Sequence, residues 1–404
     1  MSDQSKRTAA DATSDVADSA TDSGSNPQQL VDHFFRHEYA QLVASLTKRL
    51  GIRHWELVED VVQTALQRAL SHWALHGIPE NPAGWLRRVA FNQALDVLRR
   101  EARQQQLDDS INGQLQNAID HEFRDDELQD DLLRMMFVCC DPEVPPESQI
   151  ALALRTLCGF GHHEIARALL TTDASIAKRI SRARQRLHDA EIDPSVMQPG
   201  DVQQRLSHVQ SVVYLLFNEG YSSSISDRLI REELCEEAVR LALVLAEHPL
   251  TAGSESAALL ALLLFHAARL DARMDDSGAM LLLKEQDRSS WDQRLIAEAL
   301  GWFRRAGQGG AVTRYHAEAW IAAEHCRASS MEETDWERIA KGYDLLCSLA
   351  PSPVHELNRA IAIGHRDGPQ TGDLETARAA LDQAWHLAPT QAEKELICRK
   401  RDAL

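Results

Sequence analysis

No C-x-x-C pair occurs in the sequence, although it contains seven cysteines. An odd number without such pairs does not indicate a disulfide framework or a zinc site. We therefore expect reduced thiols that pack as small apolar side chains. Long apolar runs are also missing, since the longest, Ala257–Phe265, falls far short of the roughly 20 residues of a membrane helix. The polar segment Met1–Arg7 has no signal-peptide pattern, so the sequence predicts a cytoplasmic protein.

Basic residues are scarce relative to acidic ones. Lys and Arg number 43 against 61 Asp and Glu, which gives a formal net charge of −18, and only 5% of the residues are aromatic. Because phosphates repel an acidic chain, any contact with DNA must come from local basic patches. The length of 404 residues with a hydrophobic fraction of 44% predicts two to four domains with a sizeable core.

Catalytic motifs are incomplete. Gly159-Phe160-Gly161 begins like a dinucleotide-binding loop, but Glu164 stands where the third glycine belongs. His163-Glu164 begins like a zinc-protease motif, but Arg167 replaces the second histidine. No phosphate-binding Gly-Lys-Ser/Thr and no Gly-x-Ser-x-Gly nucleophile motif occurs. We expect no catalytic residue, no metal site and no cofactor.

The fold class predicted is all-α, because helical spacing of apolar residues is frequent and no period-2 strand pattern occurs. Residues 107–147 contain twelve Asp and Glu and two Arg, a local charge of −10. The predicted organisation is a disordered tail at 1–27, a helical module at 28–103, an acidic linker at 104–130, a second helical module at 131–190, a helical stretch at 200–300 and a repeat-like segment at 301–404.

The second module has the pattern of a helix-turn-helix. Helices are expected at Glu164–Leu170 and Ala174–Leu187, with the turn Thr171-Thr172-Asp173 between them. In the second helix, an apolar face is formed by Ile176, Ile180, Ala183 and Leu187, and a polar, basic face by Ser175, Lys178, Arg179, Arg182 and Arg186. Such a helix can read the major groove. The alternative is a charged face that contacts only solvent.

A helix expected from about Ala83 to Arg100 carries a second polar face. This face contains Arg88, Asn92, Asp96 and Arg99, with Arg100 beside it and Trp85 near the start. Aromatic rings next to arginines suit unpaired bases, which stack while the phosphates meet cations. The alternative for Trp85 is a place in the core.

The last hundred residues contain a short sequence motif that occurs twice. Leu349-Ala350-Pro351 recurs as Leu387-Ala388-Pro389, 38 residues later, and each copy ends an Ala/Leu-rich segment. This resembles tetratricopeptide repeats, whose usual period is about 34 residues.

Taken in order, these segments resemble the extracytoplasmic-function sigma factors of the sigma-70 family. The first module, through Glu59–Ala65 and Pro82–Arg100, resembles sigma region two. The second, through Glu164–Leu169 and Ser175–Arg184, resembles sigma region four. Val213–Tyr221 and Gln286–Asp292 resemble the subgroup with a C-terminal tetratricopeptide extension.

The resemblance implies an alternative sigma factor that binds core RNA polymerase and promoter DNA. It implies binding of core polymerase by Glu59, Asp60 and Gln63, with Asp60 exposed. The residues implied in −10 recognition are Trp85, Arg88, Asn92, Asp96, Arg99 and Arg100. Those implied in −35 recognition are Ser175, Lys178, Arg179, Arg182 and Arg186.

The extension is expected to modulate activity through a protein partner or through the sigma domains themselves. Two other interpretations remain open at this point. The chain could be a helix-turn-helix activator with a tetratricopeptide partner-binding domain, or a tetratricopeptide scaffold whose basic helices are incidental. The segment 59–100 discriminates between them, since a plain activator needs neither a polymerase-binding helix nor a promoter-melting helix.

Overall fold

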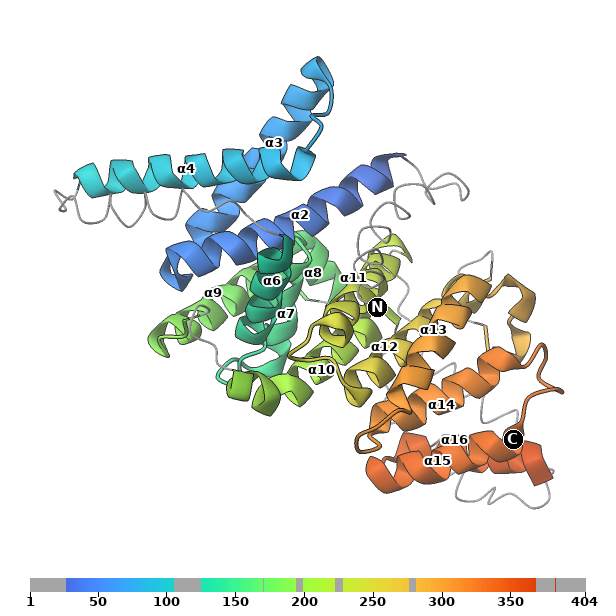
Figure 1. Cartoon of the computed structure of the whole chain (residues 1–404). Coiled ribbons are helices and arrows are strands. Elements are labelled where there is room, and N and C mark those ends of the chain that lie inside the picture. Colours follow the sequence, from blue (N-terminus) through green and yellow to red (C-terminus); the bar gives the residue numbers. More distant parts are fainter. Residues whose placement is uncertain are drawn as a thin grey trace, which may run out of the picture.

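The computed structural model describes residues 27–104, 125–169, 171–193, 199–221, 228–275, 281–367 and 382. All regular secondary structure within these ranges is helical, and the described residues contain no β-strand (Figure 1). The all-α prediction is therefore confirmed. The predicted disordered tail lies outside the described residues, except for Pro27, where the first helix begins.

The first module consists of helices α2 (Pro27–Leu50), α3 (Trp55–His76) and α4 (Pro82–Gln104), with the 3-10 turn η2 (Ile52–His54) after α2. Gly51 and Gly77, with φ angles of 86° and 81°, end α2 and α3 in a conformation that other residues rarely adopt. Pro82 begins α4, and its missing N–H costs nothing there, because the first N–H groups of a helix have no acceptor within the helix. The carboxamide Oδ1 of Asn81 accepts a hydrogen bond from the Gly84 N–H at 2.8 Å, so α4 begins at a sharp corner after the α3–α4 turn.

The second module consists of α6 (Asp125–Cys139), α7 (Pro146–Leu157), α8 (His162–Ala168) and α9 (Asp173–Asp189). Helix α6 begins within the segment 104–130 that the sequence analysis assigns to the acidic linker, and residues 105–124 of that segment lie outside the described residues. The side chain of Thr172 caps α9 by accepting a hydrogen bond from the Ser175 N–H at 3.2 Å. The predicted apolar face of α9 is buried, at Ile176, Ile180, Ala183 and Leu187.

The C-terminal part contains seven longer helices and three 3-10 turns among its described residues. The helices are α10 (Pro199–Tyr221), α11 (Arg228–Glu247), α12 (Ser254–Ala267), α13 (Gln293–Ala306), α14 (Arg314–Arg327), α15 (Trp336–Leu349) and α16 (Pro353–Asp367). The 3-10 turns are η4 (Asp271–Arg273), η5 (Leu283–Glu285) and η6 (Arg288–Ser290). Helix α12 is buried from Ser256 to Phe265, as expected for a helix that is apolar on all sides.

Helices α14, α15 and α16 pack successively, each against the next, at the end of the described chain (Figure 1). Gly342 of α15 lies so close to α14 that a Cβ atom there would be 2.7 Å from Cγ1 of Ile321. The first copy of the Leu-Ala-Pro motif begins at Leu349, the last residue of α15, whereas the copy at Leu387-Ala388-Pro389 lies outside the described residues. The tetratricopeptide interpretation therefore stays a prediction.

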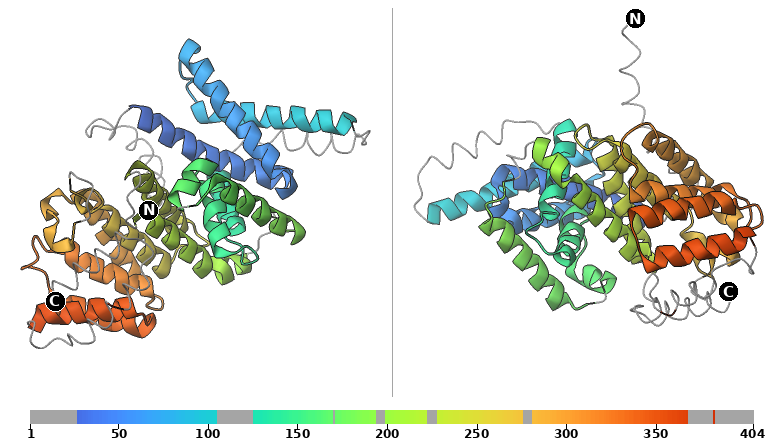
Figure 2. Two further views of the ribbon diagram at one scale, coloured as in Figure 1. Left: turned by 180° about the vertical axis from the view of Figure 1, so that it is seen from behind. Right: turned by 90° about the horizontal axis from the view of Figure 1, so that it is seen from below.

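The two modules and the first part of the C-terminal helices share one continuous core. It extends from Tyr39 in α2 to Ala323 in α14, while a smaller cluster joins α14, α15 and α16. Helix α2 packs against α6 and α7, and α10 packs against the same two helices (Figure 2). These parts were predicted to be separate modules, but in this structure they share one hydrophobic core.

Four cysteines lie in the core as expected. Cys139, Cys140, Cys158 and Cys235 are buried and carry free thiols, while Cys326 and Cys347 are half-buried. Burial, followed by the charge of Asp141, raises the pKa of Cys140 to about 12. A thiol with such a pKa is protonated at neutral pH and unreactive. Among the described helices, none combines the length and the apolar character that a bilayer crossing requires.

Acid sensitivity of folding is expected from the buried His325 at the end of α14. Its burial, followed by the charges of Arg269, Arg288 and His365, lowers its pKa to about 3. Because an unfolded histidine has a pKa of about 6.5, the unfolded chain binds a proton between these values that the folded chain does not. Stability is therefore lost as the pH falls below about 6.5, by roughly 2 kcal/mol at pH 5 for this group.

The H325Q variant should therefore lose less stability than the wild type between pH 7.5 and pH 5, measured by urea unfolding. The H188Q variant removes an exposed histidine on α9 and serves as the control. An identical pH dependence in H325Q and the wild type would contradict the expectation.

Candidate nucleic-acid interface

Helix α4 presents a polar face on the outside of the first module. Arg88, Asn92, Asp96 and Arg100 are exposed and Arg99 is half-buried. Its opposite side is buried in the core through Leu86, Ala90, Phe91, Ala94 and Leu95. The amphipathic pattern thus orients the predicted −10 residues away from the core, where they are accessible to a ligand.

Trp85, at the start of α4, is half-buried rather than a full part of the core. Its ring stacks on His72 of α3 with the ring centroids 5.5 Å apart and an interplanar angle of 14°. The edge of Trp73 meets the same ring at 5.7 Å. One side of the indole thus packs on α3 while the ring also lines a cavity, and the contact of Trp85 with a base stays a prediction.

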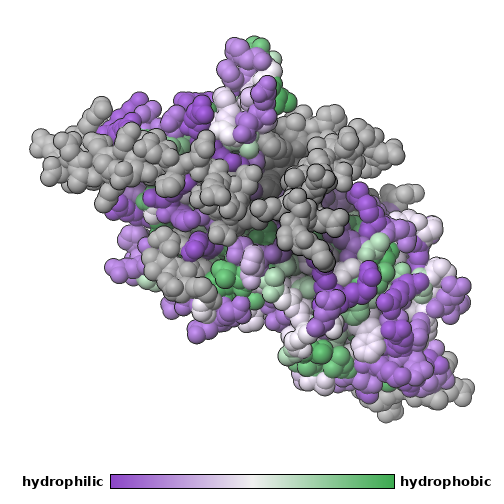
Figure 3. All heavy atoms as spheres, viewed as in Figure 1, coloured by the Kyte–Doolittle hydropathy of each residue, from purple (hydrophilic) through white to green (hydrophobic). Residues whose placement is uncertain are grey.

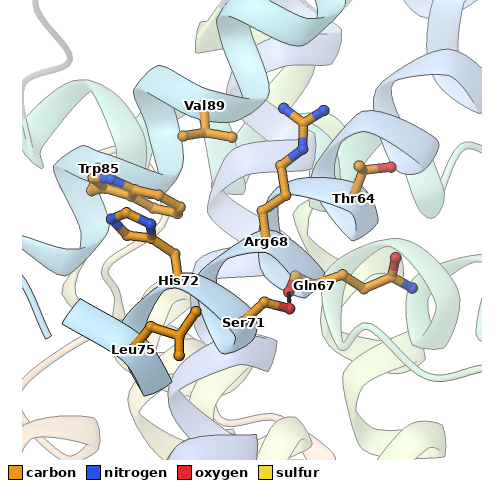
Figure 4. A pocket seen from close by; sticks show the side chains of 8 residues that line it. All are labelled: Thr64, Gln67, Arg68, Ser71, His72, Leu75, Trp85 and Val89. Carbon is orange, nitrogen blue, oxygen red and sulfur yellow. Dashed lines mark hydrogen bonds between the residues drawn. The ribbon is translucent and has the colours of Figure 1, made fainter. Parts of the chain in front are cut away.

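This cavity lies between α3 and α4 and has a volume of about 560 Å³ (Figure 4). Its size falls within the range of ordinary ligand pockets. Figure 4 shows the imidazole of His72 lying flat against the indole of Trp85, with the guanidinium of Arg68 extending along α4. The lining residues are Thr64, Gln67, Arg68, Ser71, His72, Leu75, Trp85 and Val89. The contribution of α3 was not predicted from the sequence, although Arg68 and His72 are spaced four residues apart and so share a helix face.

Large apolar side chains are exposed next to this cavity. Leu75 is 81% exposed and Ile78 in the following turn is 71% exposed, and Leu70 is also exposed. Figure 3 shows hydrophobic residues at the projecting tip of α3. Leu75 also lines the cavity, so the apolar tip borders the cavity directly.

Helix α9 presents the second polar face, on the periphery of the molecule (Figure 2). Lys178, Arg182 and Arg186 are exposed, while Ser175 and Arg179 are half-buried. Arg179 forms an exposed ion pair with Glu147 at 3.2 Å, and the Nη1 atom of Arg186 lies 3.4 Å from the Glu143 carbonyl oxygen. The structure therefore brings all five predicted −35 residues to one face of α9, where three are openly accessible.

The residues expected to bind a partner through α3 do not share one exposed surface. Asp60 is exposed as expected and Gln63 is half-buried, but Glu59 is only 4% exposed. Its carboxylate accepts hydrogen bonds from Arg155 of α7, at 3.0 Å, and from Arg184 of α9. The expectation of a common docking surface fails for Glu59 in this structure, because two cations distant in sequence pair with it.

Glu59, Arg155 and Arg184 form what we call the interdomain ion-pair cluster. The Arg184 guanidinium also lies over the ring of the buried Trp55, 5.2 Å from its centroid. Burial, and then the charge of Glu59, raises the pKa of the neighbouring Tyr39 hydroxyl. A second ion pair between the modules joins Lys48 to the buried Asp131. The cluster therefore ties the helix predicted to bind the polymerase to the helix predicted to read DNA.

The C-terminal helices contact the second module through polar groups as well as through the core. Arg205 of α10 forms an ion pair with the buried Asp141. The Nη2 atom of Arg240 in α11 donates a hydrogen bond to the Leu157 carbonyl oxygen at 2.7 Å. His208 and Gln149 are hydrogen-bonded at 3.1 Å. The described residues contain no group of three or more His, Cys, Asp or Glu that could hold a metal ion.

Comparison with known families finds matches in the same three parts of the chain. Residues 35–104 match the family described as Sigma-70 region 2, and residues 134–187 match Sigma-70, region 4. Residues 205–307 match a family of unknown function (DUF6596). The two sigma-70 matches coincide with the modules that carry the polar faces of α4 and α9.

Two curated proteins are similar to the chain. An uncharacterized protein of Rhizobium meliloti (strain 1021) is 40% identical over 327 residues, which cover 79% of this chain and 76% of that protein. The ECF RNA polymerase sigma factor SigM of Bacillus subtilis (strain 168) is 29% identical over 133 residues, 32% of this chain and 77% of that protein. No solved structure matches the chain.

Proposed function

Because the chain belongs to the same family as the uncharacterized Rhizobium meliloti protein and carries sigma-70 region 2 and region 4 domains, we propose that it is an alternative sigma factor of the extracytoplasmic-function type. In this proposal it is a non-enzymatic regulatory protein whose partners are core RNA polymerase and promoter DNA. The observation that carries the proposal is the pair of exposed polar faces on α4 and α9, each within its own sigma-70 domain.

The proposed task of the first module is to hold the opened −10 element. An unstacked base needs an aromatic surface, and its phosphates need cations. The cavity between α3 and α4 offers the ring of Trp85 together with Arg68, and the face formed by Arg88, Asn92, Asp96, Arg99 and Arg100 continues from it along α4. This arrangement supports the assignment of these residues to promoter opening.

The proposed task of the second module is to read the −35 element with α9. Arginine side chains pair bidentately with guanine, and lysine or serine reaches phosphates or base edges. Ser175, Lys178 and Arg179 lie in the first half of the helix, the part that enters the major groove in a helix-turn-helix. Arg182 and Arg186 continue the same face toward the helix end.

The R182A variant should weaken binding of a −35 duplex. A base contact contributes about 1–3 kcal/mol, or roughly 5- to 150-fold in affinity, with relaxed preference at one position. A phosphate contact would instead weaken all sequences alike and reduce the salt dependence. The measurement is fluorescence anisotropy with −35 variants at two salt concentrations.

The R304A variant removes the same charge from an exposed position of α13 and is the matched control for that measurement. If R182A and R304A weaken binding equally, the effect comes from net charge, and the assignment of α9 is wrong.

The proposed polymerase-binding residues are Asp60 and Gln63, which are accessible here, whereas the predicted Glu59 is buried and could take part only once the interdomain ion-pair cluster has opened. The D60R variant should lower affinity for core polymerase by at least tenfold, because a charge reversal places a cation where the proposal requires an anion. Folding should be unaffected, since Asp60 is exposed. The measurement is co-purification with core polymerase followed by run-off transcription, with the exposed E56K substitution one turn earlier as the control.

The same experiment tests the function as a whole. If the wild-type chain neither binds core polymerase nor directs start-site choice, while α9 still binds DNA, the chain is instead a helix-turn-helix activator with a partner-binding extension. The exposure of α9 in a structure that buries Glu59 is the observation that favours this second candidate.

The observed arrangement of the modules requires a change before both promoter elements are read. The −35 and −10 elements are about 25 base pairs apart, roughly 85 Å at 3.4 Å per base pair. Glu59 of α3 contacts α9 directly, and only roughly 25 Å of helix separates Glu59 from the end of α3 at 1.5 Å per residue. Because α4 packs against α3, we infer that the two polar faces lie closer together than the two promoter elements. Promoter binding therefore requires the interdomain ion-pair cluster to open.

We assign the proposed roles to the domains predicted from the sequence: region two at 28–103, the linker at 104–130, region four at 131–190, the helical extension at 200–300 and the repeat-like part at 301–404. The contacts of Arg205, His208 and Arg240 with region four support modulation of activity by the extension. The R205E variant places like charges at Asp141 and should change the yield of run-off transcription. A yield equal to that of the wild type would count against modulation through this contact.

A further inference from the structure

Three arginines lie together at one end of the C-terminal helices, away from α4 and α9. Arg269 follows α12, Arg273 ends η4 and Arg288 begins η6. Arg269 and Arg288 are only 9% and 7% exposed, and Arg273 is half-buried. Long basic side chains are almost never this buried unless they are paired with an anion.

None of the three arginines forms an ion pair with a carboxylate in the part of the chain that the structure describes. Arg273 donates to the Tyr221 carbonyl oxygen at 2.5 Å. Arg288 donates to the carbonyl oxygens of His325 and Ala328 at 3.0 and 2.9 Å. Arg269 donates to the side-chain oxygen of Gln286 at 3.3 Å. The exposed Glu332 acts on Arg288 only at longer range. Among the described residues, the positive charges are thus met by dipoles rather than by a carboxylate.

The arginines also repel one another. The guanidinium groups of Arg269 and Arg288 both lie over the ring of Trp291, at 4.9 and 5.2 Å from its centroid. Burial, followed in rank by the charge of Arg269, lowers the pKa of Arg288, and burial and Arg269 also lower the pKa of Arg273. The neighbouring imidazoles of His266 and His325, whose pKa values are lowered to about 3, are neutral at pH 7. These two histidines therefore add no charge to the three arginines.

Several buried nitrogen atoms of the same cluster have no hydrogen-bond partner in the structure. These include Nε of Arg269 and Nε1 of Trp291, which can only donate, and Nδ1 of His325. Trp291 is 2% exposed and His325 is 8% exposed. A buried donor without an acceptor costs about 1–3 kcal/mol, so these two obligate donors indicate that an acceptor is missing beside the three cations.

The structural alternative is that the arginines only cap helix ends. Helices α10, α12 and α14 end in this region, and each contributes roughly half a negative charge at its C-terminus. Three such ends offset only about half of three guanidinium charges. Capping also leaves Nε of Arg269 and Nε1 of Trp291 without acceptors. A positive charge of between one and two remains, which matches a dianion better than a single carboxylate.

We propose that Arg269, Arg273 and Arg288 form a binding site in the extension for a small ligand that carries a phosphate group. The planar guanidinium forks match the oxygens of a phosphate, and a dianionic phosphate balances the residual charge. The half-buried Tyr221, His266 and Arg273 form the outer edge of the site, and Arg269, Arg288 and Trp291 its buried floor. Arg273 is thus the most accessible of the three arginines, and its guanidinium lies 3.5 Å from the ring centroid of Tyr221.

The test uses the full-length chain and inorganic phosphate as the probe. Thermal unfolding and calorimetric titration are carried out at constant ionic strength, with chloride replaced stepwise by phosphate. We expect phosphate to raise the Tm of the wild type and of the control R294Q, which removes an exposed arginine from α13. The R269Q variant should lose at least tenfold in phosphate affinity. The R273Q variant, at the half-buried edge, should show the same loss if R269Q does not fold.

Two results would overturn the proposal. One is a wild type whose Tm and heat of titration do not distinguish phosphate from chloride at equal ionic strength. The other is equal phosphate stabilisation in the wild type, R273Q and R294Q, which would show general anion effects on the surface. Neither result depends on polymerase or promoter DNA, so the phosphate site stands or falls independently of the proposed function.

Discussion

Replacing Glu59 by alanine is expected to lower the free energy of unfolding by about 3–5 kcal/mol, the usual loss when one partner of a buried ion pair is removed. The substitution leaves the side chains of Arg155 and Arg184, which are 13% and 15% exposed, without their carboxylate. Arg155 would keep a hydrogen bond to the Phe160 carbonyl oxygen, and Arg184 its contact with Trp55. Neither contact supplies a negative charge.

Urea unfolding at pH 7 measures this effect, and D60N is the matched control. Asp60 is the next residue in α3 but is exposed, so D60N should stay within about 0.5 kcal/mol of the wild type. Equal stabilities for E59A and D60N would show that the interdomain ion-pair cluster contributes nothing, and the packed arrangement of the two modules would then rest on apolar contacts alone.

The R184Q variant separates the closed arrangement from the proposed contact with polymerase. It removes the ion pair between α3 and α9. The ion pair of Glu59 with Arg155 is retained, so the α3 residue proposed to bind polymerase is itself unchanged. If opening of the cluster precedes promoter binding, R184Q should maintain or raise run-off transcription while losing stability, because it favours the separated state. A yield that falls in R184Q, with affinity for core polymerase unchanged, would contradict the opening step.

Replacing Trp85 by alanine is expected to reduce binding of single-stranded −10 DNA by roughly 5- to 150-fold. This range corresponds to about 1–3 kcal/mol for the loss of one base–aromatic stack. Trp85 lines the cavity between α3 and α4, and its ring is held in place by His72 and Trp73. Binding of a −35 duplex should be unchanged, because α9 does not contribute to that cavity.

The measurement compares the two DNA fragments in the presence of core polymerase. W85F keeps an aromatic ring and should retain most of the single-strand affinity, whereas V89A truncates another lining residue without removing a ring. If W85A and V89A have equal effects, the cavity acts through its shape, and the proposed stacking of a base on Trp85 is wrong. If W85A weakens both DNA fragments alike, the variant has disturbed the fold.

Periodicity in the sequence predicted the helices of both modules because apolar side chains repeat at helical spacing within single segments. The four apolar positions of α9, from Ile176 to Leu187, are all buried, and the basic residues lie on the other side. The helix expected at about Ala83 to Arg100 is present as Pro82–Gln104, with its polar face exposed. The capping interactions of Asn81 and Thr172 are local as well, which explains why the starts of these helices were close to the prediction.

What the sequence determined by itself was therefore local: the helices, their polar faces and the order of the modules. Glu59 pairs with Arg155, which lies 96 positions later in the sequence, and with Arg184, which lies 125 positions later. No periodic pattern in the sequence connects these residues. The cavity beside Trp85 and the buried arginines around Trp291 likewise combine side chains from several helices. Only the tertiary structure decided these features, because a charge or a ring acquires its partners when separate helices share one core.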